Sequence, residues 1–373
     1  MNLYKRKIGI LCQICFARNK TIENIVDSIH DFGRCLHLAI NNLIRNKKII
    51  HKYSYLLEDG IYRCSIYGDY MFKKQNKQIA EYTTFKSITA LNKYAIPFVR
   101  CLYRLVSFKI RDNCFKDFCG TELLISSSRQ EYKVFDKKTC KVLTVYSEKR
   151  KLKQILTNKA FFAKYFKVPQ TININYNKSY CIEEYIIHNP FDPIDAIDSI
   201  CEDLLLYLLS TYKNYSYDND EDRLKAKLFS LRFGDSVLLE STIGLPKTSV
   251  HGDLWSSNVI FDGHMYFVTD FERVGVRFFL FDFFCFIFSE WLLKNDDRLL
   301  MQYNNGRFDN FFAKLPWDYN PFRKDLYLLA FLIDMTNERW SNYTEVDNKI
   351  KEALIKYIPT YYRYEENNCD IRC

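Results

Sequence analysis

The chain of 373 residues is 48% hydrophobic and 17% aromatic, with 54 Lys and Arg against 45 Asp and Glu. This composition provides enough apolar surface for a packed core and excludes a disordered chain. No apolar run reaches the roughly 18 residues that cross a membrane, and the basic N-terminus lacks the small-residue cleavage site of a signal peptide. We therefore expect no transmembrane segment and a cytoplasmic protein.

The net charge of +9 is spread along the chain. Positive charge suits a protein that binds phosphates or an acidic substrate. No nucleic-acid recognition motif is present, so we expect no nucleic-acid partner, and a basic nucleic-acid-binding protein is kept as an alternative. The 13 cysteines follow no regular spacing and are interpreted as reduced core residues. Cys12 and Cys15 have no second ligand pair with which to hold zinc.

The N-terminal part is predicted to be mostly helical. Apolar side chains recur near helical spacing across residues 21–48, with acids early and bases late, which indicates an amphipathic helix. We expect this helix to pack on its own domain, and peripheral membrane contact is the alternative. Short strands are expected within 53–74 and a helix over 80–93. Residues 1–118 are thus predicted to form a helical N-terminal extension.

The clearest strand pattern begins at residue 122. Residues 122–146 alternate apolar and polar side chains around polar turns, which predicts three strands. A helix is expected over 147–166, and two more strands within 168–186. Further helices are predicted over 195–212, 220–239, 325–339 and 345–358.

The most informative segment is residues 251–275, HGDLWSSNVIFDGHMYFVTDFERVG. Asn258 follows Asp253 by five residues, and Asp270 follows it by seventeen. The short apolar runs on either side of Asp262-Gly263 predict a hairpin, since Asp-Gly is a strong turn sequence. Because a hairpin folds the chain back, Asn258 and Asp270 are expected at the same end of two paired strands.

These three side chains fit phosphoryl transfer from a magnesium nucleotide. A carboxylate is needed to accept the proton of an attacking hydroxyl, and hard oxygen ligands are needed to hold Mg²⁺ on the phosphates. The pattern HGDxxxxN, followed by a hairpin and Asp, resembles the aminoglycoside phosphotransferase and choline kinase families, which are related to protein kinases. The resemblance implies ATP and Mg²⁺ as cofactors, Asp253 as catalytic base, His251 as a brace of its loop, and Asn258 and Asp270 as metal ligands.

The resemblance also implies an α+β fold with two lobes, as in protein kinases. A small antiparallel β lobe that binds the nucleotide is expected over 119–190. A mostly helical, catalytic large lobe is expected over 191–373. Glu184, Tyr185 and Ile186 resemble the hinge whose backbone binds adenine.

Asp282 is the one acid in the apolar run 278–287. An unpaired buried carboxylate is costly, so it needs a partner. The resemblance implies that Asp282 bonds back to the catalytic loop as structural support, and the alternative is an Asp at a helix start that caps its own backbone.

Several parts of the family pattern are altered. No Gly-rich phosphate loop is present, and Ser126, Ser127 and Ser128 stand in its place. Their amides and hydroxyls would contact phosphate, and an exposed turn is the alternative.

The family's strand lysine and helix glutamate form an ion pair at the phosphates. Here Thr144 and Gln154 stand at the expected positions. Lys133, on the preceding strand, is the candidate to supply the missing charge. Strand alternation puts Lys141 on the opposite face from Thr144, which makes it a poor substitute.

A second alignment takes Lys73 or Lys74 as the strand lysine and Glu81 as the helix acid, with the hinge over 121–125. These residues are only seven or eight positions apart, which is short for a strand and a separate helix. This alignment also leaves 131–186 as an unexplained insertion, so the first alignment is preferred.

The sequence therefore predicts an ATP-dependent phosphotransferase that acts on a hydroxyl of a small molecule, sugar or polysaccharide. The alternative is a kinase-like protein that binds a nucleotide or a partner with little or no turnover. The missing lysine and glutamate favour the alternative, and the complete set of Asp253, Asn258 and Asp270 favours the enzyme.

Overall fold

The computed structural model describes residues 56–64, 70–73, 107–110, 118–125, 131–212, 215–315, 317, 319–338 and 344–361. The chain forms two compact units. Unit 1 extends to Leu152 and includes Gln170–Tyr185, and unit 2 comprises Lys153–Pro169 and the chain from Ile186 onward. The helices predicted over 21–48 and 80–93, and the pair Cys12 and Cys15, lie outside the described residues.

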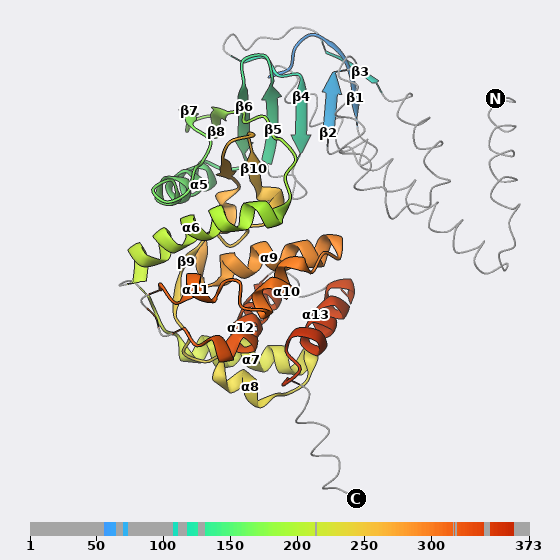
Figure 1. Cartoon of the computed structure of the whole chain (residues 1–373). Coiled ribbons are helices and arrows are strands. Elements are labelled where there is room, and N and C mark those ends of the chain that lie inside the picture. The colour runs from blue at the N-terminus through green and yellow to red at the C-terminus, as the bar shows by residue number, and fades with distance from the viewer. Residues whose placement is uncertain are drawn as a thin grey trace, which may run out of the picture. The chain divides into compact units, whose positions relative to one another are not determined.

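Unit 1 is built on an antiparallel sheet whose described strands run in the order β3-β1-β2-β4-β5-β6-β8-β7 (Figure 1). The strands are β1 Gly60–Cys64, β2 Tyr70–Lys73, β3 Ser107–Ile110, β4 Glu122–Ile125, β5 Glu131–Asp136, β6 Lys141–Tyr146, β7 Thr171–Asn175 and β8 Tyr180–Glu184. Helix α5, Lys149–Phe162, separates β6 from β7 in sequence. The three strands, helix and two strands predicted over 122–186 are therefore confirmed.

One face of this sheet carries the apolar core of unit 1. Leu123, Val134 and Leu143 come from three neighbouring strands, lie opposite one another and are fully buried. Because side chains alternate along a strand, Lys133 and Thr144 lie on the other face, where they are direct cross-strand partners. The two faces of the sheet thus differ in polarity.

The sheet extends further toward the N-terminus than the sequence predicted. Strands β1 and β2 confirm the short strands expected within 53–74, but β2 also pairs with β4, through Met71 and Leu123. Leu57 forms a bridge with Gly120. The boundary expected between residues 118 and 119 therefore falls inside this sheet.

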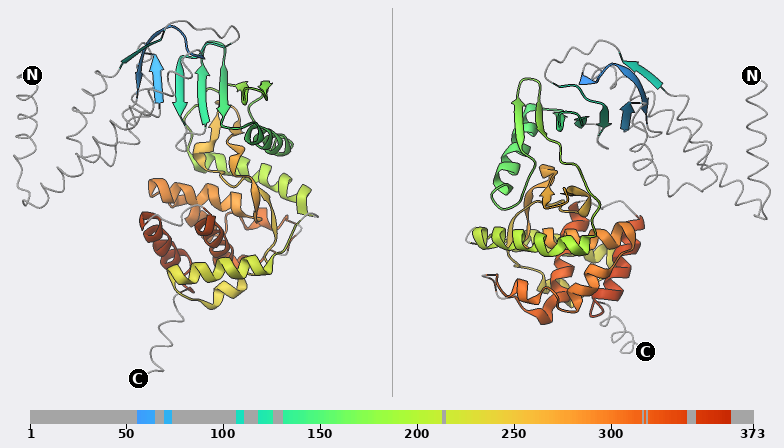
Figure 2. Two further views of the ribbon diagram at one scale, coloured as in Figure 1. Left: turned by 180° about the vertical axis from the view of Figure 1, so that it is seen from behind. Right: turned by 45° about the horizontal axis from the view of Figure 1, so that its top comes forward.

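Unit 2 is mostly helical. Its helices are α6 Pro193–Thr211, α7 Asn219–Phe233, α8 Val237–Ser241, α9 Phe281–Lys294, α10 Arg298–Asn304, α11 Asp309–Phe312, α12 Lys324–Glu338 and α13 Thr344–Tyr357. Helix α9 is buried from Phe281 to Trp291, and it contacts α6, α10 and α12 (Figure 2). An apolar sequence on all sides of a helix is what such a central position requires.

The helices begin and end at residues that satisfy their terminal backbone groups. At the start of α6, Asp192 accepts a hydrogen bond from the N–H of Ile194, and Pro193 takes the first helical position. The single helix predicted over 220–239 is instead two helices. Gly234, with φ 98°, ends α7, and its N–H donates to the carbonyl of Ser230.

Two small antiparallel pairs of strands complete unit 2. Strand β9, Lys247–Val250, pairs with β12, Gly275–Phe278, and β10, Val259–Phe261, pairs with β11, Tyr266–Val268. The predicted hairpin around Asp262-Gly263 is confirmed. A unit built on an antiparallel sheet and a mostly helical unit together make an α+β fold. No helix within the described ranges is long and apolar enough to span a bilayer.

Candidate active site

Residues 251–258 form a tight turn between β9 and β10. The N–H of Trp255 donates to the carbonyl of Asp253 at 2.9 Å, and the N–H of Asn258 donates to the carbonyl of Trp255 at 2.8 Å. Gly252 has φ 77°, a left-handed conformation that glycine adopts without strain. Asp253 is only 7% exposed, so its side chain is held in a largely buried position within the turn.

A buried carboxylate of α9 fixes the start of this turn. The Oδ2 atom of Asp282 accepts the N–H of His251 at 2.7 Å, and its Oδ1 atom accepts the N–H of Gly252 at 2.8 Å. Burial raises the pKa of Asp282, and the nearby His251 and the two N–H groups oppose that rise. The only acid of the apolar run 278–287 thus bonds to the turn that carries Asp253.

His251 connects the turn to the end of the hairpin. Its Nε2 atom lies 3.0 Å from the carbonyl of Thr269, and the N–H of Asp253 approaches its Nδ1 atom at 3.3 Å. These contacts require a proton on Nε2 and a lone pair on Nδ1, which is a neutral imidazole. Burial lowers the pKa of His251, and this favours the same state. Both ring nitrogens contact backbone groups, one in the turn and one at the end of the hairpin, so the geometry suits a side chain that braces the turn.

The hairpin brings Asn258 and Asp270 to the same end. Val259 is paired with Val268, and the N–H of Thr269 donates to the carbonyl of Asn258 at 2.9 Å. Asp270 follows directly, in the left-handed region at φ 68° and ψ 69°, which Asp tolerates better than most residues. The Nδ2 atom of Asn258 donates to the carbonyl of Asp253 at 2.8 Å. Its Oδ1 atom is therefore the end of the amide that remains for a ligand.

This donor set fits Mg²⁺. Asp270 offers a carboxylate and Asn258 a side-chain carbonyl, both of them hard oxygen ligands. Within the described ranges, no group of three or more His, Cys, Asp and Glu side chains is placed to hold a metal alone. Two protein ligands leave the remaining coordination positions for phosphate oxygens and water, which is how Mg²⁺ is held on nucleotides.

The C-terminal half of α5 packs on the chain that follows Asp270. The ring of Phe271 lies 4.9 Å from that of His251 and 6.0 Å from that of Phe162, measured between centroids. The Nδ2 atom of Asn158 donates to the carbonyl of Phe271 at 3.0 Å. Gln154, one turn earlier, is exposed. Asn158 and Phe162, which no sequence pattern singled out, are thus the residues by which α5 contacts the chain after Asp270.

The polar face of the sheet in unit 1 carries charged residues. Lys133 lies opposite Thr144, which is 1% exposed, and Lys141 is on the other face, as alternation predicts. On the same face as Lys133, Glu131 forms an ion pair with Lys151 of α5, at 2.8 Å. The acid therefore comes from the strand and the base from the helix, the reverse of the lysine–glutamate pair implied by the family resemblance.

The predicted adenine hinge is only in part available to a ligand. The N–H of Glu184 donates to the carbonyl of Gln170, and the N–H of Tyr185 donates to the carbonyl of Cys140, both at 2.9 Å. Neither N–H can bind adenine while these bonds persist. Ile186 is the first residue of unit 2 after this strand and is buried. The expected phosphate loop, Ser126, Ser127 and Ser128, lies outside the described residues.

The alternative lysine of the second alignment has a partner in unit 1. The Nζ atom of Lys73 lies 2.7 Å from a carboxylate oxygen of Glu58, which also pairs with Lys138. Its charge is thus compensated by an acid that precedes it in sequence, and Lys74 and Glu81 lie outside the described residues.

Comparisons with known proteins were made for sequence and for fold. No curated protein matches the sequence. Among solved structures, a choline/ethanolamine kinase family protein from Mesorhizobium loti is 14% identical, with a TM-score of 0.34 over 60% of this chain and 85% of that chain. Choline kinase LicA from Streptococcus pneumoniae is 12% identical, with a TM-score of 0.37 over 64% and 92%. Likenesses this weak do not bear on activity or substrate.

The family comparison covers the site itself. Residues 203–319 match the model of the phosphotransferase enzyme family. The matched segment includes Asp253, Asn258, Asp270 and Asp282, which the hydrogen bonds described above hold together. The family resemblance predicted from the HGDxxxxN pattern is therefore confirmed: the segment 203–319 of this chain is similar to the phosphotransferase enzyme family.

Proposed function

We propose that the protein is an ATP-dependent phosphotransferase that transfers the γ-phosphoryl group to a hydroxyl of a small molecule or sugar. One observation carries this proposal: Asp253, Asn258 and Asp270 are presented by one turn and one hairpin, which Asp282 and His251 hold in place. The match of residues 203–319 to a phosphotransferase family supports it.

In the proposed reaction, Asp253 accepts the proton of the acceptor hydroxyl while that oxygen bonds to the γ-phosphorus. The bond from the γ-phosphorus to the bridging oxygen breaks, and ADP leaves with the electron pair. Mg²⁺, when held by Asn258 and Asp270, would neutralise charge on the phosphates. Asp282 and His251 contribute by positioning the turn, because their contacts are all with its backbone or with the end of the hairpin.

For the nucleotide, we propose that Lys133 provides the phosphate contact in place of the missing strand lysine. Its support is that Lys133 shares a face, and a cross-strand position, with Thr144. Because the N–H groups of Glu184 and Tyr185 are already bonded, the backbone of Ile186 is the remaining candidate for the adenine edge.

The second candidate is a kinase-like protein that binds a nucleotide or partner without appreciable turnover. The buried Thr144 at the lysine position and the reversed pair of Glu131 and Lys151 favour it. This candidate has the same nucleotide site as the proposed enzyme, and the two differ only in the rate of phosphoryl transfer.

Two substitutions separate these proposals. ADP release is measured with Mg-ATP and a panel of sugars, amino alcohols and aminoglycosides, and Mg-ATP binding is measured by thermal stabilisation. We expect Asp253→Asn to abolish transfer and keep Mg-ATP binding, and Asp270→Asn to weaken both. Asn is chosen because it tolerates the left-handed backbone of Asp270.

Full activity of Asp253→Asn would contradict the proposed phosphotransferase mechanism, in which Asp253 is the base. Mg-ATP binding by the wild-type protein with no ADP release would favour the second candidate. Salt-dependent binding of DNA or RNA without nucleotide binding would support the alternative of a nucleic-acid-binding protein instead.

A further inference from the structure

A small pocket in unit 2 lies against the turn that carries Asp253. Gly252 and Trp255, which flank Asp253, form one wall, and residues of α9 and α12 form the others. The lining residues are Gly252, Trp255, Arg273, Arg277, Phe281, Cys285, Phe288, Ser289, Phe331 and Met335. Two arginines and no acid therefore line this aromatic pocket.

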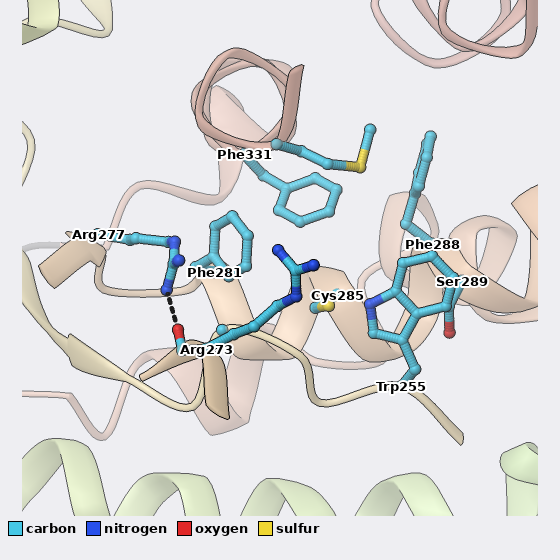
Figure 3. Close-up of a pocket in the computed structure, with 10 residues that line it drawn as sticks. Trp255, Arg273, Arg277, Phe281, Cys285, Phe288, Ser289 and Phe331 are labelled. Atoms are coloured by element: carbon cyan, nitrogen blue, oxygen red, sulfur yellow. Dashed lines mark hydrogen bonds between the residues drawn. The ribbon is translucent and has the colours of Figure 1, made fainter. Parts of the chain in front are cut away.

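The two arginines are held differently. Arg277 is 8% exposed, lies 5.1 Å from the ring centroid of Phe281, and donates from Nη1 to the carbonyl of Arg273 at 2.8 Å. The Arg273 guanidinium points into the pocket beside Phe281 and Cys285, with Trp255 on the far side (Figure 3). Arg273 is exposed, and among the residues that the structure describes no side chain or carbonyl pairs with its guanidinium.

Glu272, next to Arg273 in sequence, does not line the pocket, and the two acids of α9 are committed elsewhere. Asp282 accepts the N–H groups of His251 and Gly252. Glu290 accepts the hydroxyl of Ser256 and pairs with Lys294 at 2.7 Å. The pocket therefore presents positive charge without a carboxylate to neutralise the guanidinium of Arg273, and an arginine fork of this kind suits the oxygens of a carboxylate or phosphate.

We infer that this pocket binds an anionic group of the acceptor, so that the substrate is a polyol or sugar that already carries a carboxylate or phosphate. The inference rests on the proposed function and names its substrate class. The cavity volume of about 20 Å³ admits one water-sized group, so an anionic oxygen enters it while the body of the ligand stays outside. With its acid at Arg273, the acceptor has a hydroxyl beside the turn that carries Asp253.

The test compares acceptors that differ only by an acidic group: glucose with glucuronate and glucose 6-phosphate, and glycerol with glycerate and glycerol 3-phosphate. ADP release gives kcat/KM, and calorimetric titration of the same compounds gives binding with and without Mg-AMP-PNP. We expect a preference for the anionic member of each set. Arg273→Ala should lower its kcat/KM ten- to a hundredfold, mainly through KM, since a charge-assisted hydrogen bond is lost.

Two further variants sharpen the result. Arg323→Ala removes the same charge from a position that is also exposed but does not line the pocket, and it should change nothing. Arg273→Lys keeps the charge but loses the planar fork, so it should fall between wild type and Arg273→Ala. Both should keep the thermal stability of the wild type.

Three outcomes would overturn the inference. In one, no anionic compound binds the wild-type protein, with or without nucleotide. In another, cationic or neutral acceptors are used and Arg273→Ala leaves them unaffected. In the third, Arg273→Ala lowers kcat equally for every acceptor, which would assign Arg273 to the transferred phosphate. Failure of Mg-ATP to bind at all would instead contradict the proposed function, while the titration without nucleotide would still report on the pocket.

Discussion

The carboxylate of Asp282 receives the backbone N–H groups of His251 and Gly252, at 2.7 and 2.8 Å. One buried side chain thus satisfies two consecutive donors at the start of the turn that carries Asp253. Removing it would leave those donors unpaired in the interior of unit 2, which is more costly than losing a hydrogen bond at the surface.

We predict that Asp282→Asn lowers the free energy of unfolding by about 2–4 kcal/mol, because an amide can accept only one of the two N–H groups and carries no charge. Asp262→Asn is the control. Asp262 also accepts two backbone N–H groups, from His264 and Met265 at 2.7 and 2.8 Å, but both bond to its Oδ1 atom in an exposed turn, so the amide oxygen of Asn can keep both. Urea denaturation at pH 7 should show a much smaller loss of unfolding free energy for the control, and equal losses would contradict the need for both oxygens of the buried Asp282.

Gly252→Ala should inactivate the protein and lower its stability. A Cβ atom there would lie 2.2 Å from Nη1 of Arg277 and 2.3 Å from the carbonyl oxygen of Arg273, so the turn or the arginine must move. Gly244→Ala is the control, since Gly244 has φ 76° beside 77° at Gly252 but its nearest atom would be 3.2 Å away. Backbone strain of about 1–3 kcal/mol is common to both. Thermal unfolding and ADP release should show the excess loss in Gly252→Ala alone.

The neutral state of His251 predicts a pH dependence of stability. Its pKa is lowered in the folded state by burial, so the unfolded chain binds the proton first as the pH falls below about 6.5. His251 therefore makes the protein less stable as the pH falls through that value. His251→Gln should remove this dependence, because an amide can still donate to Thr269 and does not titrate.

The measurement is the difference in unfolding free energy between wild type and His251→Gln from pH 8 to pH 5. Asp282, Asp270 and Arg277 face His251 and are present in both proteins, so their own effects largely cancel. A difference that does not change over this range would contradict a neutral, buried His251.

Among the lysines of unit 1, we predict that Lys133 contributes to nucleotide affinity. Lys133→Ala should weaken Mg-ATP binding ten- to a hundredfold, the loss expected for a charge-assisted contact. Lys141→Ala and Lys73→Ala are controls, since Lys141 lies on the opposite face of the sheet and Lys73 is paired with Glu58. Calorimetric titration measures the Mg-ATP affinity of each variant. A loss of affinity in Lys73→Ala alone would favour the second alignment. No loss of affinity in any variant would favour the second candidate, a kinase-like protein with little or no turnover.

The parts of the site that could be predicted depend on local patterns. The alternation over 122–146 and the Asp-Gly turn at residue 262 are patterns that extend over only a few residues. They predicted the strands of the sheet and the hairpin that joins Asn258 to Asp270. The high cost of an unpaired buried carboxylate indicated that Asp282 needs a partner, and the family resemblance implied that this partner is the turn.

The parts that could not be predicted depend on contacts between distant residues. Asn158 and the carbonyl of Phe271 are 113 positions apart, and a polar residue within a helix has no pattern that indicates its partner. Likewise, no sequence pattern indicated that Glu131 and Lys151 are partners. Their ion pair depends on the register of β5 and on where α5 begins. The early strands of unit 1 were expected as strands, but their pairing with β4 depends on residues far apart in sequence.

The division of the chain within α5 determines how the protein can be cut for study. Phe162, 0% exposed, packs against His251 and Phe271, yet it precedes the two strands that return to unit 1. A fragment that begins at Ile186 would contain every proposed catalytic residue but would leave an empty space beneath His251, and the carbonyl of Phe271 would lose its donor from Asn158. Unit 2 is therefore not a contiguous piece of sequence, and a shortened protein needs residues 153–169 supplied as well.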